Sequence, residues 1–96
     1  LISQERMIFM TPKMMEVLLD FKEELAKPRP NLQKVYEKWA GPNFNDFAVA
    51  VKKLYDEGYL SMPKKDIVMG GDGDIPIDIV VDNIKITKKG YLRTKE

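Results

Sequence analysis

The sequence predicts a small α+β domain in which three helices precede a β-hairpin and a short C-terminal helix or turn. Two observations carry this prediction. Apolar residues recur at helical spacing up to residue 58, and they alternate with polar residues from residue 75 onward. A length of 96 residues with 44% hydrophobic residues suits one modest core. We therefore expect one domain over residues 11–96 after an N-terminal tail over residues 1–10.

The first helix is predicted over residues 12–26. Thr11 can cap it with its hydroxyl group, and Pro12 suits the first turn, where its missing N–H has no partner to lose. The prolines of the segment KPRP end it. The apolar stripe is formed by Met14, Val17, Leu18, Phe21 and Leu25, with Met15 and Leu19 at its margin.

The second helix is predicted over residues 31–40 and the third over residues 44–57. Asn31 can cap the second helix, and either Asn43 or Asn45 can cap the third. Glycines follow both helices, as is usual after a helix C-terminus. The core is expected to unite Leu18, Phe21, Trp39, Phe47, Val51 and Leu54.

The strands are expected after Gly58, in short segments at 59–62 and 67–69 and in a longer one over 75–81. In the longer strand, one apolar face is expected to be buried, formed by Ile75, Ile77, Ile79 and Val81. Ile84 and Ile86 continue the alternation in the opposite register, so a bulge or turn must bend the chain at residues 82–83. Thr87 then caps a last short helix or turn.

The segment GGDGD, residues 70–74, is open to three interpretations. A calcium loop would need more oxygen ligands at fixed spacing than Asp72 and Asp74 supply. A phosphate-binding loop would need a following helix and a lysine, whereas a strand is expected here. A mobile hairpin connection needs glycines that permit positive φ and aspartates that keep it soluble. We prefer this last interpretation, with no metal bound.

Cysteine and histidine are absent. Their absence removes thiol nucleophiles, thiolate zinc sites and the usual general base. Catalysis would rest on Asp72, Asp74 and Asp78 with a divalent metal, and no nucleophile accompanies them. We therefore expect no enzyme, no cofactor and no small-molecule substrate. The longest apolar run, residues 47–51, is too short to span a membrane, and residues 1–10 lack the order of a signal peptide, so the expected location is cytoplasmic.

The segments FNDFAVAVKKLYDEGYL and IKITKKGYL together resemble the winged helix-turn-helix pattern of many bacterial regulators. The arrangement is most similar to the YjcQ-like proteins of Gram-positive bacteria and their prophages, mostly of unassigned function, over about residues 11–92. The resemblance implies a winged helix with residues 31–40 as the supporting helix and residues 44–57 as the recognition helix. The GGDGD loop would be the wing tip. The wing tip differs from the usual basic wing tip in being acidic. In the usual pattern a leucine lies several residues after the Thr-x-x-Gly glycine, whereas here Tyr91 and Leu92 follow Gly90 directly.

The resemblance implies a DNA-binding protein, and hence a small transcriptional regulator whose partner is double-stranded DNA. The recognition helix would enter the major groove. Asn43 and Asn45 suit contacts to adenine, and Lys52 and Lys53 suit contacts to the phosphate backbone. Capping is the alternative role of the two asparagines, and we expect it for at least one of them.

Charge is divided along the C-terminal third of the chain. Residues 66–82 contain no base and five acids, namely Asp66, Asp72, Asp74, Asp78 and Asp82. Residues 83–95 contain no acid and five bases, which are Lys85, Lys88, Lys89, Arg93 and Lys95. Because carboxylates repel phosphates, we expect the third helix and the C-terminal segment to touch DNA while the wing tip points away. The expected DNA-binding residues are Asn43, Asn45, Lys52, Lys53, Lys85, Lys88, Lys89 and Arg93.

The second hypothesis is a protein-interaction or dimerisation module on the same fold, without DNA binding. Val49 and Ala50 are expected toward the outer side of the third helix. Met15 and Leu19 widen the apolar face of the first helix, although burial in the core is an alternative for both. Six methionines suit adaptable contact surfaces, and the segment MIFM at residues 7–10 suits a homodimer formed through the N-terminal tail and the first helix.

Overall fold

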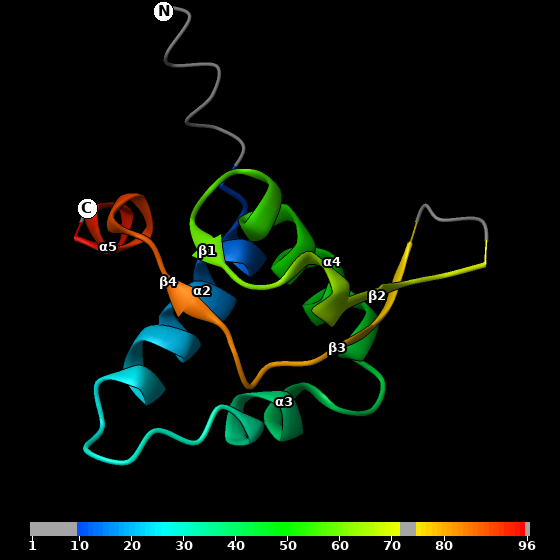
Figure 1. Ribbon diagram of the computed structural model, residues 1–96, viewed down its shortest axis with the longest axis horizontal. Helices are drawn as coiled ribbons and strands as arrows, with labels where there is room; N and C mark the ends of the chain where they lie inside the picture. Colours follow the sequence, from blue (N-terminus) through cyan, green and yellow to red (C-terminus); the bar gives the residue numbers. More distant parts are fainter. Residues whose placement is uncertain (1–9, 72–74, 96) are drawn as a thin grey trace, which may run out of the picture.

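The computed structural model describes residues 10–71 and 75–95, in which helices surround the base of a long β-hairpin (Figure 1). This is the α+β composition that the sequence predicts, with the same order of elements. In chain order these are α2 (Pro12–Leu25), α3 (Gln33–Trp39), α4 (Phe44–Asp56), β1 (Leu60–Ser61), the 3₁₀ helix η1 (Lys64–Asp66), β2 (Ile67–Met69), β3 (Pro76–Ile79), β4 (Lys85–Ile86) and α5 (Lys88–Thr94). Within the described residues, no helix has the length and apolarity needed to cross a membrane.

The ends of the helices lie close to the predicted ones. Thr11 caps α2, because its Oγ1 accepts a hydrogen bond from the Met14 backbone N–H at 3.1 Å. Before α3, Asn31 Oδ1 accepts from the Gln33 N–H at 3.1 Å, although the N-cap position is occupied by Leu32, one residue after the predicted cap. After α4, Gly58 has a φ of +84°, the left-handed conformation in which a glycine closes a helix.

Two pairs of strands form two parts of one hairpin, since β1 pairs antiparallel with β4 and β2 with β3. Five residues separate the paired parts on each side, 62–66 on one strand and 80–84 on the other, so the register continues across the interruption. Within it, the Val80 N–H donates to the Asp66 carbonyl at 2.8 Å. The interruption therefore bends the hairpin without shifting its pairing.

The predicted bend at residues 82–83 is confirmed as a turn, in which the Ile84 N–H donates to the Val81 carbonyl at 3.2 Å. Because the turn reverses the alternation, odd-numbered residues reach the core before the turn and even-numbered residues reach it after the turn. Those buried are Ile79, Val81, Ile84 and Ile86.

The expected burial of Ile75 and Ile77 is wrong, since their exposed fractions are 51% and 58%. The cause is a β-bulge: Val68 pairs with Asp78 and Met69 pairs with Pro76, so Ile77 of β3 is the extra residue without a partner. A bulge inserts an extra residue and so inverts the side-chain alternation beyond it. Pro76 consequently faces the core, and the two isoleucines face solvent.

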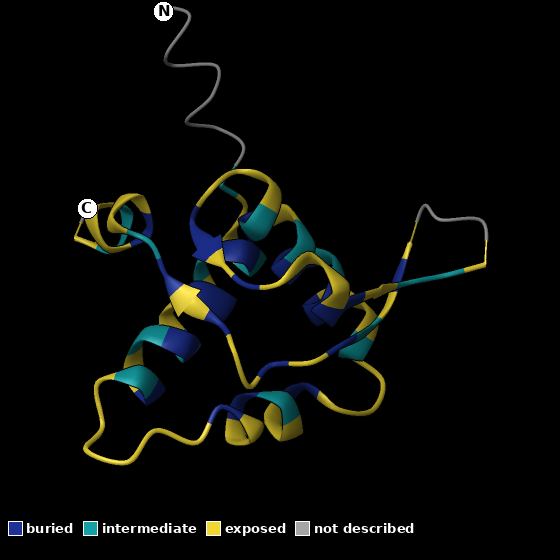
Figure 2. Ribbon diagram, in the orientation of Figure 1, coloured by how far each residue is buried: buried dark blue, intermediate teal, exposed yellow. Residues whose placement is uncertain are grey.

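The hydrophobic core lies between α2, α4 and the hairpin, with α3 closing one side (Figures 1 and 2). The Trp39 ring stacks on Phe47, with ring centroids 6.0 Å apart and ring planes 16° apart. The expected core is confirmed, because all of its predicted members are buried, namely Leu18, Phe21, Trp39, Phe47, Val51 and Leu54.

Two expectations about helix faces are corrected by the way α2 packs on α4. Ala50 is 3% exposed, so its placement toward the outer side of the third helix is wrong. Leu19 is 43% exposed, so the alternative that it belongs to the core is also wrong. Met15 is half-buried at the margin of the core, and Val49 is half-buried at the edge of the α4 surface.

Glu24 is a buried acid at the end of α2, with a side chain that is 6% exposed. Its carboxylate accepts hydrogen bonds from the Asn31 backbone N–H and from Lys27 Nζ, each at 3.0 Å. The bond from Asn31, followed by the bond from Lys27, lowers the pKa of Glu24 below its usual 4.5. Glu24 therefore holds the loop that leads into α3.

The Thr-x-x-Gly motif joins α5 to the end of α4. Thr87 Oγ1 accepts from the Gly90 N–H at 3.0 Å, which confirms the predicted cap, and donates to the Gly58 carbonyl at 2.7 Å. Gly90 is buried, and a Cβ added to it would lie 2.4 Å from the Tyr59 carbonyl oxygen. Only glycine allows α5 to approach this closely.

Candidate nucleic-acid interface

The connection between α3 and α4 is short. Four residues, 40–43, separate the two helices, and Gly41 has a φ of +99°. A turn of three to four residues that often contains glycine is typical of helix-turn-helix units. It leaves α3 packed across the end of α4 and frees the side of α4 that faces away from the core (Figure 1).

Asn43 precedes α4 but does not cap it through its side chain. Its φ of −96° and ψ of 4° differ from the extended conformation that lets a capping side chain reach back to the helix. Asn45 lies inside the first turn of α4, where it cannot cap, and it is exposed. The expectation that at least one of the two caps α4 is wrong, and within the described residues both amides lack a protein hydrogen bond.

The outer face of α4 consists of exposed and half-buried residues, namely Asn45, Asp46, Val49, Lys52, Lys53 and Asp56. Lys52 Nζ lies 2.6 Å from a carboxylate oxygen of Asp56, one helical turn further along. Lys53 makes no ion pair with any described residue. Two lysines and two aspartates give this face no net charge.

Grooves border this outer face on both sides. One, of about 280 Å³, lies toward the start of α2 and is lined in part by Thr11 and Lys13. The other, of about 220 Å³, lies toward the hairpin and is lined in part by Ile75 and Pro76. The outer face of α4 is therefore a ridge between α2 and the hairpin.

The basic C-terminal residues lie at the opposite end of α4 from the two asparagines. Lys89 Nζ donates to the Glu57 carbonyl at 2.7 Å and lies 4.7 Å from the centre of the Tyr59 ring, so it has a structural role. Lys85 on β4 and Lys88 on α5 are exposed, and Arg93 is half-buried. Because α4 is about 20 Å long, these residues do not form one patch with Asn43 and Asn45.

Two acids of the hairpin, Asp66 and Asp78, make hydrogen bonds within the fold. Asp66 is buried and accepts from Asn83 Nδ2 at 3.4 Å. Asp78 accepts from the Tyr36 hydroxyl at 2.9 Å, and this bond, with burial, raises the pKa of Tyr36 above its usual value. The predicted wing-tip acids, Asp72 and Asp74, lie outside the described residues. The same holds for residues 72–74 of the GGDGD loop as a whole.

Lys64 and Lys65, which sequence reasoning did not select, add positive charge at the base of the hairpin. Both are exposed on η1 and form no ion pair with the described residues. Lys64 shares a surface hollow of about 240 Å³ with Lys52 of α4. The sequence signal was the pair of lysines after Pro63, but their nearness to α4 depends on how the hairpin folds back.

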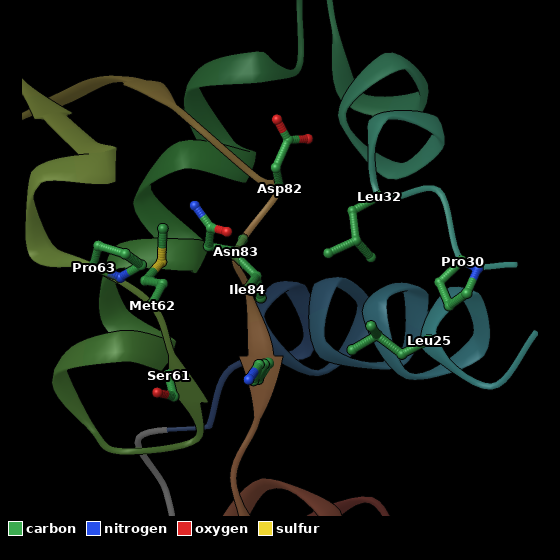
Figure 3. A pocket seen from close by; sticks show the side chains of 10 residues that line it. Leu25, Pro30, Leu32, Ser61, Met62, Pro63, Asp82, Asn83 and Ile84 are labelled. Atoms are coloured by element: carbon green, nitrogen blue, oxygen red, sulfur yellow. The ribbon is translucent and has the colours of Figure 1, made fainter.

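A larger surface pocket, of about 610 Å³, lies between the end of α2 and the interrupted part of the hairpin (Figure 3). Leu25 and Leu32 face Met62 and Pro63 across it. Its charged lining residues are Asp82 and Lys85, and the described residues contain no cluster of acids that could hold a metal ion.

No family model, curated protein or solved structure matches this chain.

Proposed function

We propose that this chain is a DNA-binding protein of the winged-helix type, in which α3 and α4 form the helix-turn-helix and β2–β3 the wing. The observation that carries the proposal is the four-residue turn before α4 together with the uncovered ridge that α4 forms between α2 and the hairpin. A major groove about 12 Å wide accepts such a helix. The role as a cytoplasmic regulator related to YjcQ-like proteins rests on the sequence resemblance alone.

Asn45 is the residue best placed to read a base, because it lies at the exposed N-terminal end of α4 with a free amide. An asparagine amide can pair with the N6 and N7 edge of adenine. Asn43 lies two residues earlier, in the turn before α4, and is also exposed. Asp46 beside them disfavours phosphate at this end, so the asparagines face bases in this proposal.

The cations that remain for phosphate are Lys53 on α4, Lys64 and Lys65 on η1, and Lys85 and Lys88 near α5. Lys64 and Lys65 flank the ridge on the hairpin side, and Lys88 lies near the C-terminal end of α4, whereas Lys85 lines the pocket beside the end of α2. Lys52 and Lys89 are engaged within the protein and contribute less. The predicted C-terminal contacts therefore serve the backbone that flanks the groove.

The test is a fluorescence anisotropy titration with labelled random duplex at several salt concentrations. We expect binding that weakens with salt, and Lys53→Ala or Lys88→Ala to lower the slope of log K against log salt by about one each. Arg29→Ala is the matched control, because Arg29 is an exposed base in the loop between α2 and α3, away from α4. Asn45→Ala should change sequence preference in a selection from random duplexes. Binding that is absent, or equal at all salt concentrations, refutes the proposal.

The alternative is a protein-interaction module on the same fold. One observation favours it, which is the absence of net charge on the outer face of α4. A recognition surface for DNA is usually basic. Failure to bind duplex at low salt by a folded protein would select this alternative.

A further inference from the structure

Val49 is the apolar member of the outer face of α4, which otherwise carries polar and charged side chains. Those other members are Asn45, Asp46, Lys52, Lys53 and Asp56. Val49 lies one helical turn after Asn45 and one turn before Lys53. It lines the groove toward α2 and also the groove toward the hairpin. The half-buried side chain of Val49 therefore lies on the crest of the ridge between the two grooves.

The polar surroundings of Val49 differ from the centre of a protein-protein interface. Such a centre is depleted of charged residues and is built from large apolar and aromatic side chains. Ile75 lies across one of the grooves, but it belongs to the hairpin and not to the helix face. A single apolar side chain among polar ones is matched by a polar partner that carries isolated apolar groups.

The major groove of DNA has this character. The edges of the base pairs present hydrogen-bond donors and acceptors there, and the 5-methyl group of thymine is the apolar group among them. If α4 lies in the groove, a valine that faces only donors and acceptors covers them without replacing their hydrogen bonds to water, and this is unfavourable. A valine that faces a thymine methyl group buries apolar surface on both sides.

The spacing along α4 fixes which thymine is concerned. Asn45 and Val49 are four residues apart, which is about 6 Å along a helix axis. Successive base pairs are about 3.4 Å apart along the duplex. A helix that follows the groove therefore brings Val49 within about two base pairs of the base that Asn45 contacts.

We propose that Val49 contacts the 5-methyl group of a thymine within about two base pairs of the adenine that Asn45 binds. This inference rests on the proposed binding of DNA by α4, and it adds a residue that determines sequence preference. The contact recognises the methyl group and makes no hydrogen bond to the base. Uracil at this position therefore loses the contact, and 5-methylcytosine, with its methyl group on the same ring carbon, provides it in place of cytosine.

The test uses the duplex that the parent protein prefers in a selection from random sequences. Each thymine is replaced singly by deoxyuridine, which removes one methyl group and keeps the hydrogen-bonding groups of the base. Fluorescence anisotropy should show that one replacement, within about two base pairs of the adenine whose preference is lost in Asn45→Ala, raises Kd about fourfold, the value of one buried methyl group. At the same position, 5-methylcytosine should bind about fourfold more tightly than cytosine.

The variant Val49→Ala connects this effect to one side chain. It should bind the thymine and deoxyuridine duplexes equally, because removal of either partner already removes the contact. Val80→Ala is the matched control, since Val80 is an exposed valine, at 40%, that lines neither groove. Ile75→Ala tests the apolar neighbour across the groove. Both of these variants should keep the fourfold difference between thymine and deoxyuridine.

The possible failures are distinguishable. If duplex is bound but no deoxyuridine replacement changes Kd, the methyl contact is overturned and DNA binding stands. A difference that persists in Val49→Ala, or that disappears in Ile75→Ala, assigns the methyl group to another residue and overturns the inference as well. A folded parent that binds no duplex at low salt overturns DNA binding itself. Circular dichroism melting shows whether each variant is folded, which is expected for Val49→Ala because alanine favours a helix.

Discussion

Replacement of Gly90 by alanine has two opposing effects on stability, and the size of each can be estimated. In a helix, alanine is favoured over glycine by about 1 kcal/mol, so an isolated α5 would gain from the change. In the protein, the new Cβ would lie 2.4 Å from the Tyr59 carbonyl oxygen and 2.8 Å from the Ile86 Cγ2, where ordinary contact begins at 3.4 Å. The packing effect must therefore be compared with the gain in helix propensity.

The packing effect should exceed that gain, because the atom in the way belongs to the backbone. The Tyr59 carbonyl accepts a hydrogen bond from the Thr87 N–H at 3.1 Å, beside the β1–β4 pair, so it cannot move alone. Overpacking costs about 1–3 kcal/mol, and a backbone obstacle places the cost in the upper half of that range. After the helix gain, Gly90→Ala should destabilise the protein by about 1–2 kcal/mol, and lower Tm by roughly 5–15 °C.

The loss of stability can be measured by urea and thermal unfolding. Unfolding is followed by circular dichroism and by the fluorescence of the single tryptophan, Trp39. Gly71→Ala is the matched control, since an added Cβ there meets nothing within 4 Å. That variant should be neutral or more stable by up to about 1 kcal/mol. If Gly90→Ala is as stable as the parent while Gly71→Ala behaves as expected, the proposed close packing of α5 is refuted.

Two further predictions concern the core and the buried acid. Leu54→Ala should cost about 2–4 kcal/mol in urea unfolding, because Leu54 is fully buried and its truncation leaves a cavity, whereas Leu92→Ala, at an exposed position, should cost less than about 0.5 kcal/mol. Glu24→Gln should lower Tm at pH 7, since the depressed pKa of Glu24 means that its carboxylate stabilises the folded state above its usual pKa of 4.5. The difference from the parent should shrink as pH falls below 4.5 through the folded pKa, and a difference in Tm that is constant from pH 7 to pH 3 would contradict this assignment.

The parts of the fold that depend on the local order of residues could be predicted from the amino-acid sequence. The helix ends were predictable because Thr11, Asn31 and Gly58 satisfy or terminate the backbone hydrogen bonds of their own neighbours. The core of α2 and α4 followed from helical periodicity, and the turn at residues 82–83 followed from the change of parity along the chain. The exposed lysines and asparagines of the candidate interface were equally open to prediction, because polar residues on the outer side of an amphipathic helix stay in solvent.

Which side chains are free to contact a partner, and which are engaged within the protein, depends on how the elements pack together. The bulge at Ile77 depends on how β3 pairs with β2, and it turned Ile75 and Ile77 outward against the alternation. The nearness of Lys64 to α4, and the bond from Lys89 to the Glu57 carbonyl, join residues that are distant in the chain. Such contacts arise when packing brings separate elements together, and neither periodicity nor spacing along one segment contains that information.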